Sequence, residues 1–465
     1  MSLMALSQII LRSALLGSLL LVSTAGTGMG QVSSVFPGGW VEHQGTATRA
    51  RFSASQIQSF VPPTRGPFTF PSPYNTKAIR ITDASDCGGT DCVAYVGYSY
   101  WRNTNAHEGG NDMWIFLGLN SAKGGGGPTL FKLDKTTDNI TKVGPLFPAG
   151  SKFVSNTGEG WYFSASRENK LYLNDGPKML RYDVVSHLFD TVFDITAHFG
   201  SNRYIWQMHS SNDDMVHSAT LRVSNTDEDL GCLVYSEKTQ QFSFFAKQGT
   251  FDECHIDKSG RFLLIEENID NLYDVENVFI DLQTGAQKTV YDQDGAVAHV
   301  DMGYGYVAGS DNWNPLPNAS VTWTFTPTWT KGPVDFYNVN WNVSQVNHLS
   351  HQNAKASIPM KQQFACGSSA DRGVVQNELV CFRLDTSYDQ LVVAPIMTNL
   401  DAPGGGTDYA KTPKGNLDIS GKYFIWTTNL GGNRLDAFLV MVPSQRLLAP
   451  GDLTPPVAPN NLKVT

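Results

Sequence analysis

Four histidines recur in the sequence at a nearly constant interval. His209, His255, His299 and His348 are separated by 46, 44 and 49 residues. Residues at equivalent positions of a repeat converge in space when the repeats are arranged around an axis. Neutral imidazoles from successive repeats would supply the three or four nitrogen or oxygen ligands that a metal ion needs. The spacing therefore predicts a central metal site, whereas histidines that only cap turns would need no common spacing.

The strongest carboxylate pattern near these histidines has a structural explanation. Asp257 and Asp418 precede Ser and Gly in short polar turns, where an aspartate caps its own backbone. Glu266 and Glu267 end an apolar run, so at least one of them is expected to face a channel or a partner. We find no convincing carboxylate pair for glycoside hydrolysis, and no nucleophile elbow, phosphate loop or calcium loop in the sequence.

The elements that must position the histidines are short β-strands, each introduced by a repeated turn. Residues 255–265 and 416–426 share the pattern Asp-x-Ser-Gly, followed by β-branched and aromatic residues, and residues 209–219 and 299–309 are looser versions. Asp and Gly supply the chemistry of a tight turn, and the run after it predicts a buried strand.

The repeats group into blocks of the length and strand content of β-propeller blades. Seven blocks are predicted, over residues 90–147, 158–196, 204–248, 251–293, 298–342, 347–397 and 411–443. The expected fold is therefore all-β, a seven-bladed β-propeller of four-stranded blades.

Length and composition agree with one large propeller domain. The chain has 465 residues with 43 Gly, 10 Trp, 17 Tyr and 25 Phe, which suits hairpins punctuated by glycine and blades packed by aromatic rings. The net charge is −9 without a basic cluster, which argues against nucleic acid as a partner. We expect a monomer.

The two ends of the chain predict an exported protein. Residues 1–30 have the apolar stretch and small residues of a secretory signal, too short for a membrane span, so the mature chain is expected to lack one. Residues 31–89 form a lead-in segment before a propeller at 90–443. Residues 444–465 predict a Pro-rich linker and the start of a module like fibronectin type III.

Six cysteines also agree with export, because an even number is expected of a secreted, periplasmic or cell-surface chain. Their spacing suggests local bridges, although it does not prove connectivity. The candidates are Cys87 with Cys92, Cys232 with Cys254, and Cys366 with Cys381.

The turn pattern Asp-x-Ser-Gly-Arg/Lys with its aromatic strand resembles the repeat of TolB-like propellers. With histidines entering successive blades and the cluster Gln345, His348 and His351, the chain is similar to the seven-bladed oligogalacturonate lyase propellers. This resemblance implies a metal site of His255, Gln345, His348 and His351, with His209 as the base, and it leaves His299 unassigned. In this sequence the second histidine of the cluster is offset by one residue from the family's spacing.

The resemblance implies β-elimination on an acidic polysaccharide or oligosaccharide. A divalent ion (Mn, Ca or Zn) would neutralise the uronate carboxylate and acidify the neighbouring C–H, and a base would remove that proton. Arg203, Arg261 and Arg434 lie near blade entries or hairpins and are the candidates for positioning the acidic sugar. The alternative is a non-catalytic propeller that binds glycan or protein within a multidomain surface protein.

Overall fold

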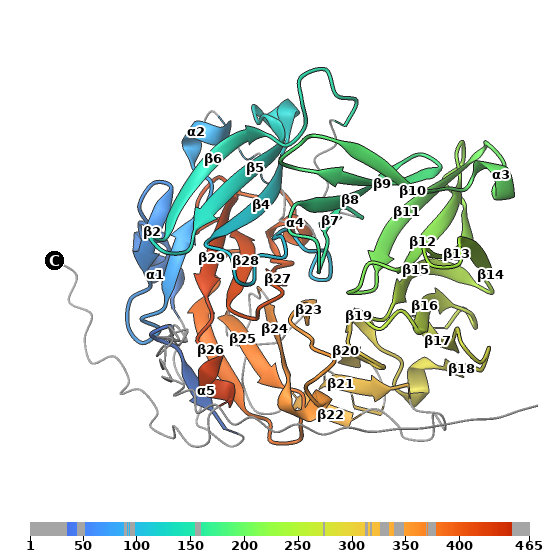
Figure 1. The fold of residues 1–465 in the computed structure, drawn as a ribbon. Helices are drawn as coiled ribbons and strands as arrows, with labels where there is room; N and C mark the ends of the chain where they lie inside the picture. The colour runs from blue at the N-terminus through green and yellow to red at the C-terminus, as the bar shows by residue number, and fades with distance from the viewer. Residues whose placement is uncertain are drawn as a thin grey trace, which may run out of the picture. The chain divides into compact units, whose positions relative to one another are not determined.

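The protein is described from a computed structural model. The structure describes residues 35–43, 52–87, 91, 93, 98–153, 160–272, 275–311, 315–316, 319–325, 334–338, 348–368, 370 and 378–448. Within these residues the chain forms seven antiparallel sheets that follow one another around a central axis, which is a seven-bladed β-propeller (Figure 1). The predicted fold class is confirmed.

The first four blades follow the chain without interruption, and each lies inside one predicted block to within one residue. Blade 1 contains β4 (Asp112–Leu119), β5 (Gly127–Asp134) and β6 (Asn139–Pro145), and Thr104 adds an inner bridge to Ile115. The next three blades have four strands each. Blade 2 contains β7 (Tyr162–Phe163), β8 (Lys170–Asp175), β9 (Lys178–Asp183) and β10 (Phe189–Asp194). Blade 3 contains β11 (Arg203–Ser210), β12 (Val216–Val223), β13 (Asp229–Ser236) and β14 (Gln241–Ala246). Blade 4 contains β15 (Thr250–Ile256), β16 (Phe262–Asn268), β17 (Glu276–Asp281) and β18 (Gln287–Val290).

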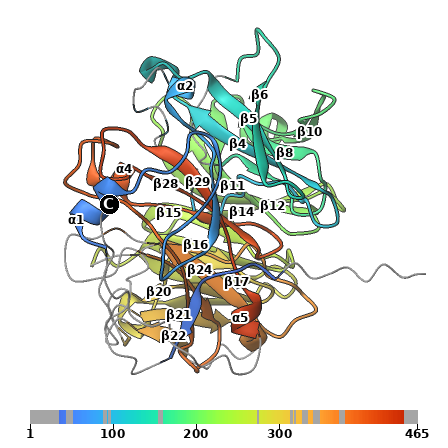
Figure 2. The same ribbon diagram turned by 90° about the vertical axis from the view of Figure 1, so that its left-hand side faces the viewer.

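The last two blades receive strands from the start of the chain. Blade 5 is regular, with β19 (Ala298–Met302), β20 (Tyr306–Asp311), β21 (Ala319–Thr324) and β22 (Val334–Asn338). Blade 6 contains β23 (His348–Ser350), β24 (Phe364–Ser368), β25 (Glu378–Arg383) and β26 (Gln390–Pro395), and β1 (Trp40–Glu42) pairs with β26 at its edge. Blade 7 contains β27 (Asn416–Leu417), β28 (Tyr423–Thr428) and β29 (Asp436–Met441), extended by β3 (Lys77–Arg80) and β2 (Gly66–Thr69). Figures 1 and 2 show these first strands beside the last ones.

Helices are few and short among the described residues. They are α1 (Ala54–Ser59), α2 (Ala84–Cys87), α3 (Thr196–Phe199), α4 (Asp408–Lys411) and α5 (Gln445–Leu448). In the described residues, no helix is both long and apolar enough to cross a membrane.

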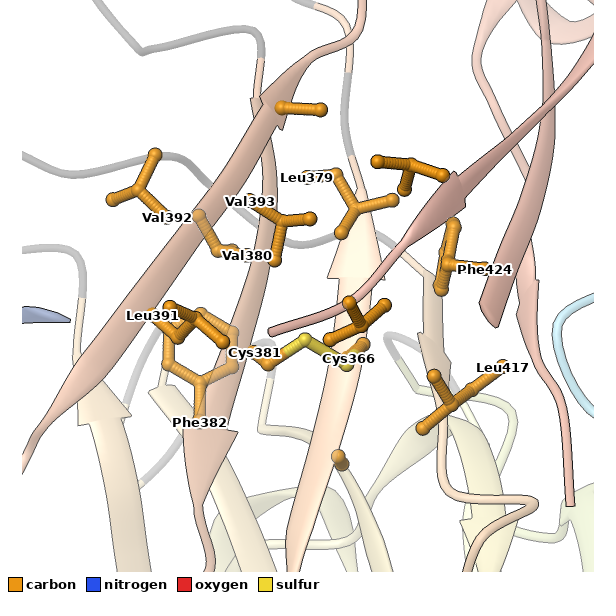
Figure 3. Close-up of a cluster of buried hydrophobic side chains, with 14 of the residues drawn as sticks. Cys366, Leu379, Val380, Cys381, Phe382, Leu391, Val392, Val393, Leu417 and Phe424 are labelled. Carbon is orange, nitrogen blue, oxygen red and sulfur yellow. A yellow bond between two sulfur atoms is a disulfide. The ribbon is translucent and has the colours of Figure 1, made fainter. Parts of the chain in front are cut away.

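The hydrophobic core lies between neighbouring blades. One cluster joins blades 6 and 7, and it includes Phe382, Leu391, Leu417 and Phe424 around a disulfide bond (Figure 3). Further clusters join the other neighbouring pairs, such as Ile205 and Tyr172 between blades 2 and 3. Each sheet therefore buries both of its faces, and strands such as β16 and β28 are almost entirely buried.

The repeated turn fixes where each inner strand ends. In blade 4, Asp257 Oδ1 accepts the backbone N–H groups of Arg261 (2.9 Å) and Phe262 (3.0 Å), and Gly260 has a φ of +74°. Asp418 accepts from Lys422 and Tyr423 in the same way in blade 7. The turn aspartates therefore cap the turn that connects each inner strand to the next strand.

Disulfide bonds connect Cys232 with Cys254 and Cys366 with Cys381. The first bond joins blade 3 to blade 4, and the second joins directly opposed residues on β24 and β25. Cys87 is also disulfide-bonded, and Cys92 lies outside the described residues. Two of the predicted pairings are thereby confirmed.

Candidate metal centre

The inner strands of blades 3, 4 and 5 are matched by their backbone hydrogen bonds. The backbone N–H groups of Ser211, Asp257 and Gly303 each donate to the carbonyl oxygen of the first residue of the next strand. The distances are 2.8, 2.8 and 2.7 Å. The residues two positions earlier are His209, His255 and Asp301. The expectation that His299 is equivalent to His255 therefore needs correction, because Asp301 occupies that position and His299 lies two residues before it.

His299 instead occupies a β-bulge, at the position that Gln207 has in blade 3. The register of β11 shifts between Trp206 and His209, and that of β19 shifts between Ala298 and Asp301. Gln207 and His299 both have left-handed backbone conformations within these bulges, with φ values of 46° and 50°. Such conformations are costly for residues other than glycine and occur where they aim a side chain.

His209 and His255 come together with a carboxylate at the axis. Their ring centroids are 4.2 Å apart, and one ligand atom from each of His209, Glu253 and His255 lies within 4.8 Å of the others. Glu266 Oε1 is 3.4 Å from His255 Nε2. All four side chains are buried. Two nitrogens and carboxylate oxygens at this spacing form a donor set suitable for a divalent ion.

The same four residues carry ligand atoms without a hydrogen-bond partner among the described residues. These atoms are His209 Nε2, His255 Nε2, Glu253 Oε2 and Glu266 Oε1. His255 Nε2 and Glu266 Oε1 are close enough for an ion pair, but His209 Nε2 and Glu253 Oε2 are left without any such contact. Buried polar atoms are almost always paired in folded proteins, so these atoms require an explanation. A bound cation would provide one.

Burial and charge set opposite pKa shifts within the cluster. Burial, aided by the charge of His255, holds the pKa of His209 well below its usual range, so its imidazole is neutral. Burial also disfavours the charged form of His255, but Glu253 and Glu266 outweigh it and raise the pKa of His255 to about 10. Burial raises the pKa of Glu266 to about 7. A positive charge is thus stabilised at this point, as a proton or as a metal ion.

The other two predicted histidines form a second pair. The ring centroids of His299 and His348 are 4.6 Å apart, and His348 Nε2 lies 3.0 Å from the Tyr98 hydroxyl. Tyr98 contacts Tyr100 at 5.0 Å between centroids, and Tyr100 contacts His255 at 4.9 Å. The four histidines are therefore brought together as two pairs joined by two tyrosines.

The remaining predicted site residues lie apart from these pairs or outside the described residues. Both ring nitrogens of His351 already have hydrogen-bond partners. Its Nε2 is 2.5 Å from the Tyr306 hydroxyl, and its Nδ1 is 2.9 Å from the Phe364 carbonyl oxygen. Gln345 lies outside the described residues. Arg261 and Arg434 pair with Asp281 (2.7 Å) and Asp436 (2.5 Å), and Arg203 contacts the Asn202 carbonyl oxygen at 3.2 Å.

Two cations that the sequence analysis missed line the central cavity instead. Arg102 is buried and donates to Gln352 Oε1 at 2.6 Å, and Lys258 is buried and lies 2.9 Å from Asp301 Oδ1. Lys258 follows the turn Asp257, which is the local signal that could have identified it. Arg102 stands in an irregular segment, where sequence patterns give little guidance.

The cavity at the axis is small. Its volume is about 20 Å³, which is room for about one water molecule or ion. The residues that line it are Tyr100, Trp101, Arg102, Tyr162, His209, Ser210, His255, Ile256, Lys258, Asp301, Met302 and Gln352. The geometry therefore favours a metal ion rather than a large ligand within the cavity itself.

Solved structures with the same fold include two oligogalacturonate lyases. One, in complex with manganese, is 12% identical, covers 83% of this chain and 98% of its own, and has a TM-score of 0.57. The other, from Vibrio parahaemolyticus, is 11% identical, covers 82% and 98%, and has a TM-score of 0.56. The predicted resemblance to this propeller is confirmed at the level of the fold. No protein-family model matches the sequence, and no curated protein matches it significantly.

Proposed function

We propose that the chain binds a divalent metal ion through His209, Glu253 and His255, with Glu266 beside them. The observation that carries this proposal is the convergence of buried ligand atoms from His209, Glu253 and His255, together with His209 Nε2 and Glu253 Oε2, which have no hydrogen-bond partner among the described residues. Unpaired buried carboxylate and imidazole atoms cost free energy, and coordination removes that cost. The likeness to a lyase solved with manganese supports a divalent ion without specifying which one.

We further propose that the chain is a lyase that cleaves acidic oligosaccharides by β-elimination. When bound, a divalent ion would neutralise the sugar carboxylate and acidify the neighbouring C–H. Arg102 and Lys258 would add positive charge at the same cavity. Since that cavity holds about one ion, the sugar would bind at its opening and present only its carboxylate.

The proton acceptor in this proposal is His348. Burial holds the pKa of His348 well below its usual range, so the ring is neutral, and its Nδ1 has no hydrogen-bond partner among the described residues. His348 would take the proton beside the carboxylate while the bond to the leaving sugar oxygen breaks, which yields an unsaturated sugar. The sequence assigned this role to His209, but the structure groups His209 with the proposed ligands.

Disulfide bonds support an exported protein as the setting for this activity. The two described bonds and bonded Cys87 are expected in an oxidising compartment such as the periplasm or the cell exterior. Extracellular polysaccharides are accessible there.

Metal analysis tests the first proposal. The purified chain, incubated with Mn, Ca or Zn and then desalted, is expected to retain one equivalent of metal. The double variant His209→Ala, His255→Ala should lose it, whereas the control His198→Ala, an exposed histidine on α3, should keep it. A wild-type chain that retains no metal would refute the metal site.

A lyase assay tests the second proposal separately. Oligogalacturonate and other uronate oligomers are incubated with the metal-loaded chain, and absorbance from unsaturated products is followed. His348→Ala is expected to keep the metal and lower the rate by about 100-fold or more, the usual contribution of a general base. Retained metal without any product from uronates would instead favour the non-catalytic binding propeller.

A further inference from the structure

Blade 3 contains a hydrogen-bonded series of serine, histidine and glutamate. Ser210 Oγ is 2.6 Å from His217 Nδ1, and His217 Nε2 is 3.1 Å from Glu237 Oε1. Since the carboxylate accepts the Nε2–H, His217 Nδ1 is left as the acceptor for the serine hydroxyl. The Tyr162 hydroxyl lies 2.6 Å from Ser210 Oγ and can donate to it. A nucleophile, a base and a group that orients the base are thus in hydrogen-bond reach of one another.

The propeller fold does not require this polar pair. Ser210 and His217 are directly opposed on β11 and β12. The equivalent opposed pairs in other blades are Ile256 with Leu263, Met302 with Val307 and Leu417 with Phe424, and all of these are apolar. Blade packing is therefore satisfied by hydrocarbon side chains at this position, and the serine and histidine of blade 3 need a separate reason.

Ser210 also faces a place where a reaction is possible. Ser210 is one of the residues that line the central cavity, and its hydrogen-bond partner His217 is fully buried. Arg102 and Lys258 line the same cavity, and their positive charge suits the oxygen that becomes negative when a carbonyl group is attacked. Since the cavity, at about 20 Å³, has room for about one water molecule or ion, an ester would bind at its opening and present only its carbonyl group to Ser210.

We propose that Ser210, His217 and Glu237 form a catalytic triad that hydrolyses small carboxylic esters. Ser210 Oγ attacks the carbonyl carbon while His217 Nδ1 takes the hydroxyl proton. The C–O bond of the ester breaks, and His217 returns that proton to the leaving alcohol. Water then attacks the acyl-serine with His217 again as the base, which releases the acid and restores the serine. This activity is distinct from the proposed lyase reaction and needs no metal ion.

Covalent labelling tests the triad directly. The full chain is treated with methanesulfonyl fluoride, a small serine-directed reagent, and the modified peptide is identified by mass spectrometry. We expect the label on Ser210 and an equal loss of 4-nitrophenyl acetate hydrolysis. Ser210→Ala and His217→Gln should lower that hydrolysis by about 100-fold or more. The control Ser350→Ala removes a buried inner-strand serine that bonds the Leu417 N–H, and should retain hydrolysis and labelling.

Each outcome decides the proposal. A wild-type chain that is not labelled at Ser210, or ester hydrolysis that survives Ser210→Ala, would show that the series is only a structural network. The mapping of the label on the wild-type chain does not depend on whether the variants fold. Metal content measured on the same samples separates this result from the proposed metal site, because labelling is expected with and without a chelator.

Discussion

His351 illustrates how a single buried side chain can couple stability to pH. Its two ring nitrogens lie against the Tyr306 hydroxyl and the Phe364 carbonyl oxygen. Burial, together with the charge of Lys258, lowers the pKa of His351 to about 4. In the unfolded chain a histidine titrates near its ordinary pKa of about 6.5. The unfolded state therefore binds more protons between these two values, and stability falls as the pH falls through this window.

The expected loss is about 2 kcal/mol between pH 7 and pH 5 from His351 alone. Urea unfolding of the wild-type chain and of His351→Gln at both pH values measures it. The variant should be less stable at pH 7 and should show a smaller difference between the two pH values. An unchanged pH dependence in His351→Gln would contradict the assignment. The matched control is the exposed His198→Ala, which should behave like the wild-type chain.

At the same scale, the sequence located the axial histidines but not all their neighbours. The repeat predicted that His209, His255, His299 and His348 converge, and ring contacts connect all four through Tyr98 and Tyr100. It could not predict that His299 falls out of register, because Gly303 rather than Asp301 takes the place of the turn Asp257, and the turn after it is shorter. The positions of Arg102 and of the paired Arg261 and Arg434 depend on tertiary contacts, which spacing does not encode.

Between elements, the two described disulfide bonds offer a matched comparison. Cys232–Cys254 closes a span of 22 residues and Cys366–Cys381 a span of 15 residues, so each should stabilise the chain by about 3 kcal/mol. Only the first joins two blades, and Cys254 directly precedes the proposed ligand His255. Loss of this bond is therefore expected to disturb the orientation of that ligand as well.

The double variants Cys232→Ala, Cys254→Ala and Cys366→Ala, Cys381→Ala test this distinction. Both should unfold at lower urea concentrations by similar amounts. The first alone should weaken metal binding, by about 10-fold or more, which is the usual effect of disturbing the support of a ligand. Equal metal affinities in the two variants would contradict the expected coupling between the disulfide and the site.

Most blades could be predicted because their signals are local. Turn residues and alternating runs within about 45 residues define blades 2 to 5, and the observed strands fall inside the predicted blocks to within one residue. The pairing of β3 with β29 could not be predicted, since it joins segments at opposite ends of the domain. Residues 31–89 therefore appeared as a lead-in segment, whereas β1, β2 and β3 complete blades 6 and 7.

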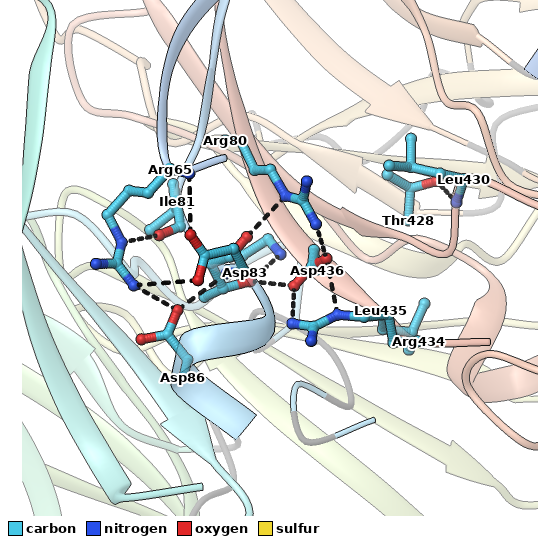
Figure 4. Close-up of polar contacts among 12 residues, drawn as sticks. Arg65, Arg80, Ile81, Asp83, Asp86, Thr428, Leu430, Arg434, Leu435 and Asp436 are labelled. Carbon is cyan, nitrogen blue, oxygen red and sulfur yellow. Dashed lines mark hydrogen bonds and ion pairs between the residues drawn. The ribbon is translucent and has the colours of Figure 1, made fainter. Parts of the chain in front are cut away.

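For the whole molecule, closure of the ring depends on these first strands. β3 pairs with β29 through Ala78, Ile79 and Arg80, and Arg80 lies 2.6 Å from Asp436. Asp436 also accepts from Arg434 and the Thr82 hydroxyl, beside a second group in which Arg65 pairs with Asp86 (Figure 4). Without β3 the edge of β29 would be unpaired and apolar, and Asp436 would lose its ion pair with Arg80.

Two shortened chains test closure. A chain that begins at Phe36 should melt like the full chain, because all described strands remain. A chain that begins at Ala84 lacks β1, β2 and β3, and should aggregate or melt at least about 10 °C lower, since exposed strand edges promote association. Circular dichroism and size-exclusion chromatography provide the measurements. Equal melting temperatures and a monomeric elution for both chains would contradict this role of the first strands.

The same closure constrains the time at which the protein can finish folding. Arg80 and Asp436 are 356 residues apart in the sequence, and they meet at the seam of the ring. During synthesis β1 and β3 leave the ribosome long before β26 and β29 are made, so they stay without these partners while the blades between them form. The ring can therefore close only after blade 7 has been made, so the segment that is synthesised first completes the fold last.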